Sequence, residues 1–335
     1  MKMKRVSYFI FSLMLVGALS CTKQGSEPVP GGEIRFSADT GVSPLTKADS
    51  KDDIEDFAVY GWNTGSADWS SISSLGTPIF TNTQAVKSSD SYVTVGEKKY
   101  WEEGKYHFVA YAPYMETSPA TFEGAGNSFK LKFANYVTST STVDLLYSEF
   151  ATDKIKSDVI VPLEFKHALS KILFTFAVSD KNNMVSVDSI EIRPVLISLG
   201  NFYTKASFTY DGNNPSWTTP TEKGSITNTS VVKSSAGYDA YVLPQTLAED
   251  ASFKITYKVV YHATDAEGAD TEVVAGPFAS SSIKFLDGSV GTWTELKIGK
   301  QYTAKVNVNA FNGEIKVAAL EVGDWGTASG TIETK

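Results

Sequence analysis

The chain has 335 residues, of which 42% are hydrophobic and 20% charged, and its 30 basic and 38 acidic side chains give a formal net charge of −8. This composition is typical of a globular protein with enough apolar residues for real cores, and the length suggests two domains of ordinary size. An acidic chain without a basic stripe argues against nucleic acid as a partner.

The first twenty residues have the pattern of a secretory signal peptide. Lys2, Lys4 and Arg5 form a positive segment, and residues 6–19 are apolar. The apolar run is too short for a membrane span, and polar residues follow it. Removal of residues 1–20 takes away three positive charges and changes the formal net charge from −8 to −11.

Cys21 follows the apolar run directly and is the only cysteine of the chain, so no intramolecular disulfide can form. A single cysteine at this junction resembles a bacterial lipobox, although Ala18-Leu19-Ser20 departs from the usual Leu-Ala-Gly. We therefore expect lipidation at Cys21. The alternative is an ordinary signal peptide followed by an incidental cysteine.

Residues 22–33 are polar and rich in Pro and Gly, as in a flexible tether. The following segments alternate with period two or form short apolar runs, and none has the pattern of an amphipathic helix of three turns. The pattern predicts an all-β protein of antiparallel β-sandwiches. The expected strands lie near residues 33–38, 56–62, 105–113, 128–134, 187–195, 240–247, 252–263, 301–311 and 314–322.

The polar turn at residues 179–184 is the expected domain boundary, because it follows a long apolar strand and precedes a new series of strands. This predicts an N-terminal β-sandwich over residues 49–180 and a C-terminal one over residues 181–335. Residues 21–48 would form the lipidated tether and first strand, a candidate propeptide.

Catalytic signals are weak. The three histidines, His107, His167 and His262, are far apart and lack metal-ligand spacing, and neither a G-x-S-x-G motif nor a phosphate-binding loop is present. The acidic loop at residues 265–272 lacks EF-hand spacing, which favours a solvated hairpin over a Ca²⁺ site. We expect no catalytic residue, no cofactor and no metal. Paired carboxylates from distant strands leave a surface hydrolase as a remote alternative.

His167 lies in an alternating segment in which Phe165, His167 and Leu169 share one face. The alternation then shifts to Ile172 and Phe174, as a β-bulge or bend would produce. The pattern favours a structural histidine, half-buried at a strand bend and bonded to backbone, over a catalytic one.

The segment around His167 and five other blocks resemble, in order, the conserved stretches of the fimbrillin-like proteins, the major and minor fimbrial subunit families of gut and oral anaerobes. The ordered series carries the resemblance, which spans nearly all of the chain after the signal peptide. The blocks are KKYWEEGKYHFVAYAPY (98–114), DLLYS (144–148), FKHALSKILFTF (165–176), AYVLPQTL (240–247), WTELKIGKQYTAKVNV (293–308) and VGDWG (322–326).

The resemblance implies two transthyretin-like β-sandwich domains in a lipoprotein anchored in the outer membrane. Members of the family build adhesive pili as stalk, anchor or tip subunits. The implied partners are other fimbrial subunits or further copies of the chain, and a glycan or protein receptor on a host or bacterial surface. In stalk subunits a protease removes the first strand, and a C-terminal strand of the next subunit fills the groove by β-augmentation.

Carried over by position, the removable strand is residues 33–38, with Ile34, Phe36 and Ala38 on its inward face. The processing site falls at Lys47, where the family usually has Arg. The donor strand would be the C-terminal segment, in which Ile332 is the one large apolar residue. A single such residue favours a tip, an anchor or an unpolymerised lipoprotein over a stalk.

The chief alternative is a glycan-binding surface lipoprotein that does not polymerise. Six tryptophans and sixteen tyrosines offer stacking platforms, and residues 63–71 have the composition of an exposed loop around Trp69. We favour core packing for these aromatic residues. In particular, we expect Trp101 and Trp325, which match family blocks, to anchor the sandwich cores or strand edges.

Overall fold

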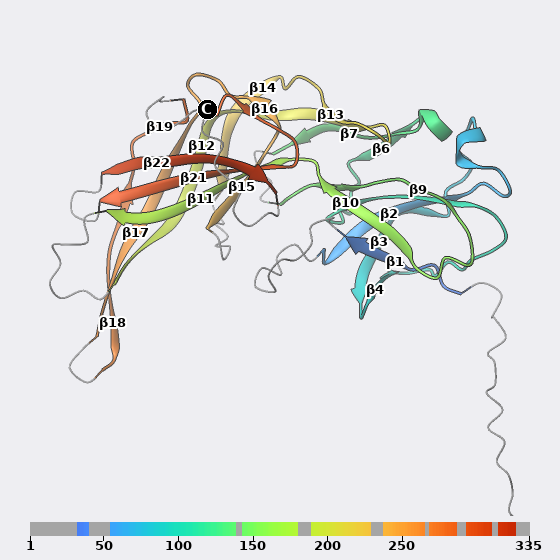
Figure 1. Cartoon of the computed structure of the whole chain (residues 1–335), viewed down its shortest axis with the longest axis horizontal. Coiled ribbons are helices and arrows are strands. Elements are labelled where there is room, and N and C mark those ends of the chain that lie inside the picture. The colour runs from blue at the N-terminus through green and yellow to red at the C-terminus, as the bar shows by residue number, and fades with distance from the viewer. Residues whose placement is uncertain are drawn as a thin grey trace, which may run out of the picture.

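The computed structural model describes residues 32–39, 54–138, 143–179, 189–228, 237–264, 268–286, 293–309 and 314–325 (Figure 1). Regular structure in these ranges consists of strands and two short 3-10 turns, η2 (Trp69–Ser71) and η3 (Gly126–Ser128). The prediction of an all-β protein is thus confirmed. Within the same ranges, no helix has the length and apolarity needed to span a bilayer.

The first sheet closes on itself. Its strands follow one another in the order β2, β3, β4, β1, β10, β8, β5 and β9, and β2 also pairs with β5. All of these pairings are antiparallel except that of β1 with β10. The strands are β1 (Phe36–Asp39), β2 (Asp56–Asn63), β3 (Phe80–Ser88), β4 (Ser91–Thr94), β5 (Tyr106–Ala112), β8 (Leu146–Ser148), β9 (Ala151–Lys154) and β10 (Val161–His167).

The interior of this barrel is a core of aromatic and aliphatic side chains. Alternate residues of each strand point inward, as the pleat requires. On β2, Phe57 and Val59 belong to this core. Gly61 of the same strand has no room for a side chain, because a Cβ there would lie 2.8 Å from the Phe108 ring and 3.0 Å from Phe80.

Strands β2 and β5 are buried on both faces. Their outward residues, including Tyr60 and Tyr111, belong to a second core with Phe133 and Phe208. Phe133 lies on β7 (Lys130–Val137), which pairs with β6 (Ala120–Glu123), and Phe208 lies on β12 (Ser189–Tyr210). The barrel wall is therefore the middle layer between its own interior and a second sheet.

The second sheet runs in the order β18 (Asp270–Ala279), β17 (Ser252–Thr264), β12, β7 and β6. Strands β13 (Pro215–Trp217) and β14 (Glu222–Asn228) also pair with β12, and β19 (Ile283–Lys284) pairs with β17. A third sheet runs in the order β15 (Tyr238–Val242), β11 (Ser170–Ser179), β21 (Lys300–Asn309) and β22 (Ile315–Asp324). A small pair joins β16 (Gln245–Thr246) to β20 (Glu295–Leu296).

The third sheet and the first half of β12 enclose the core of the C-terminal part. Phe174 of β11 and Phe253 of β17 contribute aromatic side chains to this core, with ring centroids 5.1 Å apart. Two sheets sharing one apolar core form a β-sandwich. The transthyretin-like character of the sandwich stays a prediction.

Strand β12 connects both parts of the molecule. Residues 189–200 of this 22-residue strand pair with β17, and residues 205–210 pair with β7. The strand follows the expected boundary near residue 180, yet its second half covers the barrel, as the long strand in Figure 1 shows. The division into residues 49–180 and 181–335 stays a prediction.

Trp325 joins the end of β22 to the barrel. Its ring stacks on His167 of β10 at a centroid distance of 3.7 Å and on Tyr241 of β15 at 5.6 Å. Lys171 lies over the same ring at 5.6 Å. These contacts bring together strands of two sheets, so Trp325 anchors the packing between them.

Trp325→Ala and Trp101→Ala should each lower the melting temperature. Both indoles are buried, and loss of a large buried aromatic side chain costs about 3–5 kcal/mol. The measurement is thermal unfolding followed by circular dichroism, with the exposed Val322→Ala on β22 as a control that should change little. An unchanged melting temperature in either tryptophan variant would contradict the anchoring role.

Candidate functional site: the first strand in its groove

Strand β1 lies between β4 and β10 and completes the ring of the barrel (Figure 1). Phe36 to Asp39 run parallel to Val161 to Glu164, and Phe36 also pairs with Tyr92 of β4. The residues before β1 continue the ladder. The amide of Ile34 donates to the carbonyl of Lys99 at 2.9 Å, and that of Val161 donates to the carbonyl of Arg35 at 2.8 Å.

The inward side chains of this segment fill the barrel. Ile34 is 1% exposed and Phe36 is fully buried, while Ala38 packs against the same core. Phe36 makes edge contacts with Phe108, Phe80 and Phe57, with centroids 5.3, 6.0 and 6.1 Å apart. Residues 34–38 therefore contribute side chains to the barrel core, although they lie at the N-terminal start of the described chain.

The place that β1 occupies, here called its groove, is bounded by backbone and side chains of the barrel. Trp101 packs edge-on against Tyr106 at 4.9 Å, and its amide donates to the carbonyl of Gly32 at 3.0 Å. Tyr92 donates from its hydroxyl to the carbonyl of Ile54 at 2.5 Å. A strand that occupied this groove would need backbone groups for both edges and apolar side chains at alternate positions.

Glu33 adds an ionic contact at the start of the segment. Its carboxylate lies 3.3 Å from the ammonium of Lys98 and 3.5 Å from the guanidinium of Arg35, and its side chain is only 9% exposed. One of its carboxylate oxygens is buried without a hydrogen-bond partner. The two cations compensate a charge that would otherwise be costly to bury.

The other predicted site residues lie outside the described residues. Cys21 precedes the described chain, Lys47 falls between Asp39 and Ile54, and Ile332 follows Trp325. The structure therefore brings together Ile34, Phe36 and Ala38 in one groove. That these three are removable stays a prediction, as do the roles of the other three residues.

His167 is held as a structural residue. Its Nδ1 lies 2.5 Å from a carboxylate oxygen of Asp144, and its ring lies flat on Trp325. The expectation of a backbone partner was wrong, since the partner is a side chain 23 residues away. The expected bend is present, because β10 ends at His167 and β11 begins at Ser170.

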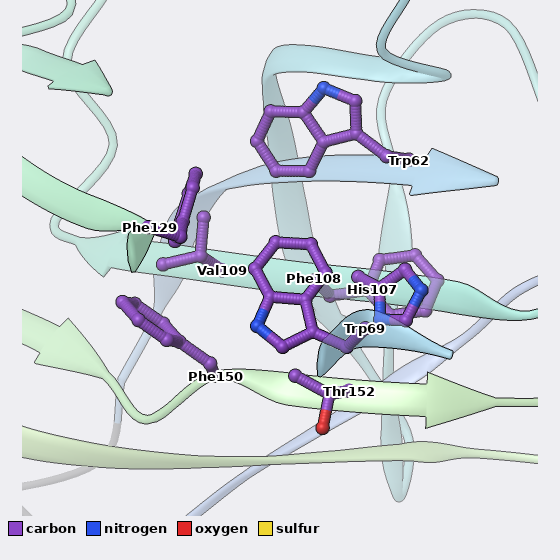
Figure 2. Close-up of a pocket in the computed structure, with 8 residues that line it drawn as sticks. All are labelled: Trp62, Trp69, His107, Phe108, Val109, Phe129, Phe150 and Thr152. Carbon is purple, nitrogen blue, oxygen red and sulfur yellow. The ribbon is translucent and has the colours of Figure 1, made fainter. Parts of the chain in front are cut away.

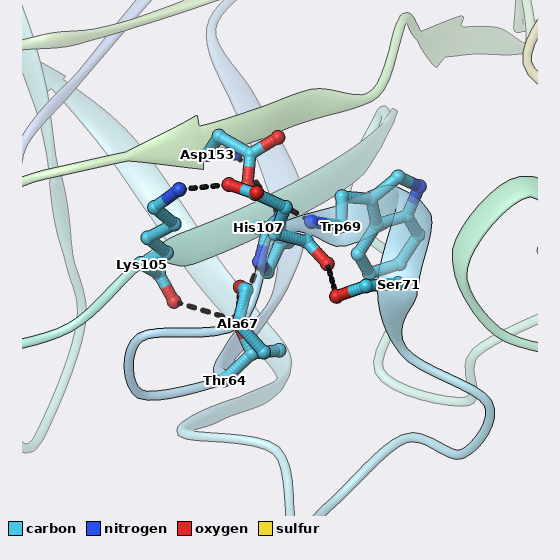
Figure 3. Close-up of polar contacts among 8 residues, drawn as sticks. Thr64, Ala67, Trp69, Ser71, Lys105, His107 and Asp153 are labelled. Atoms are coloured by element: carbon cyan, nitrogen blue, oxygen red, sulfur yellow. Dashed lines mark hydrogen bonds and ion pairs between the residues drawn. The ribbon is translucent and has the colours of Figure 1, made fainter.

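His107 is a buried histidine that the sequence pattern did not single out. Its Nδ1 accepts from the amide of Asp153 at 3.1 Å, so its Nε2 carries the proton and donates to Thr64 Oγ1 at 2.8 Å (Figure 3). Thr64 donates in turn to the carbonyl of Ala67 at 2.9 Å. This chain of bonds ties the loop at residues 64–71 to the barrel wall.

Trp69, the aromatic residue of the loop at residues 63–71, points inward and does not offer an exposed stacking surface. Trp69 is 8% exposed, its amide donates to Asp153 Oδ1 at 2.9 Å, and its ring packs on His107 and Phe129. Figure 2 shows Trp62, Phe129 and Phe150 around it. The space between these rings does not admit a water molecule. The favoured interpretation of Trp69 as a packing residue is confirmed, while Gly65, Asp68 and Ser70 of the same loop are exposed.

The other tryptophans are likewise engaged. Five of the six are buried, and Trp217 is partly buried with its indole N–H donating to the carbonyl of Ala168 at 2.7 Å. His262 lies 3.7 Å from Glu191 and 3.8 Å from Glu272, far along the chain from the other histidines. Among the described residues, no group of three or more His, Cys, Asp or Glu side chains is arranged to hold a metal ion.

His107 should make the fold sensitive to acid. Burial lowers the pKa of His107 from its ordinary 6.5 to about 4; Asp153 opposes this shift and Lys105 adds to it. Between pH 6.5 and 4, His107 is therefore protonated in the unfolded chain and neutral in the folded one. The free energy of unfolding falls as the pH drops from about 6.5 towards 4. His107→Gln should flatten this part of the curve of melting temperature against pH. A variant that keeps the full slope would contradict the assignment.

Comparisons with known proteins were made with solved structures and with sequence families. A solved structure from Bacteroides uniformis, described as a candidate cell adhesion protein, is 18% identical with a TM-score of 0.51, and the match covers 88% of this chain and 98% of that one. A fimbrial protein from Bacteroides vulgatus is 16% identical with a TM-score of 0.45 and coverages of 88% and 100%. The tip fimbrial protein Mfa3 from Porphyromonas gingivalis, with a C-terminal truncation, is 11% identical with a TM-score of 0.39 and the same coverages.

At these identities, the first of the three structures shows a shared fold and nothing finer. No curated protein sequence matches the chain at a significant level. The sequence model of the fimbrillin-like family, however, matches residues 46–325, which include the barrel strands from β2 onward and the C-terminal sandwich. The chain belongs to the fimbrillin-like family.

Proposed function

We propose that this protein is a lipid-anchored fimbrial subunit or fimbrillin-like adhesion protein of the bacterial outer membrane, and that its first strand is replaceable. The observation that carries the proposal is the position of β1. It supplies Ile34 and Phe36 to the barrel core, yet its only chain connection to the barrel passes through residues 40–53, which contain Lys47. One cut there leaves β1 held by noncovalent contacts alone.

Loss of β1 would leave unpaired strand edges and an apolar cavity that another strand could fill. The edges of β4 and β10 would lose their backbone partners, and the phenyl ring of Phe36 would leave a cavity between Phe57, Phe80 and Phe108. An unpaired edge beside an apolar groove pairs with whatever strand is available. A strand from another subunit would restore both the ladder and the core by β-augmentation.

The donor in this proposal is the C-terminal segment of another copy or of a related subunit. Residues 326–335 of this chain contain one large apolar residue, Ile332. The groove presents at least two deep positions, those of Ile34 and Phe36. This mismatch favours a subunit at the end of a polymer, which accepts a donor strand without donating one, over a stalk subunit that does both.

Cleavage after Lys47 should convert the monomer into an acceptor. With a related fimbrial subunit added as donor, treatment of the purified precursor with a Lys-specific protease should produce a ladder of higher oligomers on native gels, because the emptied groove takes up a donor strand. The precursor alone should oligomerise less, because its own C-terminal segment has one large apolar residue. The double variant Lys47→Gln/Lys51→Gln should remove the ladder while leaving cuts at lysines elsewhere, because these two are the lysines of the 40–53 connection, which makes it the matched control.

Deletion of residues 326–335 separates the two possible donors. If the ladder disappears with the deletion, the chain donates to itself. If the deletion variant still forms the ladder, but only after a related subunit is added, the chain is an acceptor. A Lys47-cut product that stays monomeric under both conditions would refute strand replacement.

Lipidation at Cys21 is the second part of the proposal. The cysteine directly follows the apolar run of the signal peptide and is the only one in the chain. Acyl chains contribute about 0.8 kcal/mol for each buried CH₂, so two or more of them anchor a protein stably.

Cys21→Ala should release the protein from the membrane fraction of cells. Mass spectrometry of the wild type should show an acylated residue 21 at the N-terminus. An unmodified thiol on a protein recovered outside the membrane would disprove the anchor, while leaving strand replacement unaffected.

A further inference from the structure

Four large apolar side chains are exposed at the end of the barrel where the chain enters β1. Val159 is 76% exposed, Tyr100 54%, Ile155 44% and Ile160 39%. We call these four residues the entry rim. They make up four of the twelve exposed large apolar side chains of the described residues, and single exposed apolar residues are common whereas a group is not.

The backbone places the entry rim on both sides of the incoming chain. On one side, Tyr100 forms a β-bridge with Glu33, and the next residue bonds to Gly32. On the other side, Val159 and Ile160 directly precede Val161, which pairs with Phe36. Ile155 begins the turn that leads into this strand, and its carbonyl accepts from the amide of Asp158 at 2.8 Å.

The charges beside the entry rim are paired. Lys98 contacts Glu33 at 3.3 Å, Lys99 contacts Glu97 at 2.9 Å, and Lys156 contacts Glu103. The surface is therefore apolar with locally balanced charge. Such a surface suits a neutral, zwitterionic lipid headgroup layer better than a strongly anionic partner.

The length of chain before Gly32 limits what the rim can face. If Cys21 carries the lipid, as proposed above, eleven residues (21–31) join the membrane to the described chain. A flexible linker of this length has a root-mean-square span of about 18 Å and a maximum of about 40 Å. The end of the barrel that holds the entry rim is thus kept close to the bilayer surface.

We infer that the entry rim is a membrane-contact surface. Val159, Ile160, Ile155 and Tyr100 enter the boundary between headgroups and acyl chains, to the shallow depth that interfacial apolar side chains reach. The contact orients the barrel with the start of β1 towards the lipid and the C-terminal sandwich away from it. The inference rests on the proposed anchor at Cys21, but its test does not.

The test uses the single cysteine of the mature chain, residues 21–335, to attach the protein chemically to phosphatidylcholine vesicles that contain a maleimide-headgroup lipid and a doxyl-labelled lipid. Val159→Trp places a fluorophore on the entry rim. Val273→Trp places one on β18, at a position that is also highly exposed (64%). The six native tryptophans contribute equally to both samples, so the difference reports the two positions.

The Val159→Trp emission should shift to shorter wavelength and be quenched by the doxyl lipid, and the Val273→Trp emission should not. Adding Ile160→Asp should abolish the difference, since a carboxylate opposes insertion. Circular dichroism checks that every variant is folded; these are exposed positions. The result should not change with added salt, because the contact is apolar.

Equal quenching at the two positions would overturn the inference. So would a dimer of the uncoupled wild type in light scattering that Ile160→Asp dissociates, because the entry rim would then join two copies. Because the coupling is chemical, either result is independent of whether cells acylate Cys21. Mass spectrometry of the protein isolated from cells tests the acylation of Cys21 separately.

Discussion

The ladder that holds residues 33–39 between β4 and β10 is the contact on which the barrel depends. Both partners of β1 are distant in the chain, since β1 ends at Asp39 while β4 begins at Ser91 and β10 at Val161. A β-sheet with unpaired edges is prone to non-native pairing, and closure removes those edges. The first described strand therefore closes a ring that the rest of the chain leaves open.

The second layer of the barrel wall depends on that closure. Tyr60 and Tyr111 face outward on strands whose inner residues pack around Phe36, so the two cores share one sheet. The outer core is covered by β7 and the second half of β12, which continues into the C-terminal sandwich. Strand β12 thereby belongs to both the outer core of the barrel and the C-terminal sandwich. Trp325 makes a second connection, through His167.

The strands were predictable because their alternation follows from burial on one face. Residues 33–38 show this well, with Ile34 and Phe36 buried and Arg35 at the surface. The layers were not predictable, since the positions of β7 and β12 depend on pairing between distant segments. Trp69 shows the same limit at a single residue. It lies in a polar loop, and Asp153, which fixes it, is 84 residues away.

The groove of β1 has one more property, which concerns direction. Strand β1 is parallel to β10 and antiparallel to β4, so its two neighbours run in opposite senses. A strand entering the other way round would again meet one parallel and one antiparallel neighbour. The backbone hydrogen bonds at this position therefore discriminate little between the two chain directions. The longer edge, β10, would pair slightly more stably with an antiparallel strand. The direction of any strand that occupies the slot is set by its side chains.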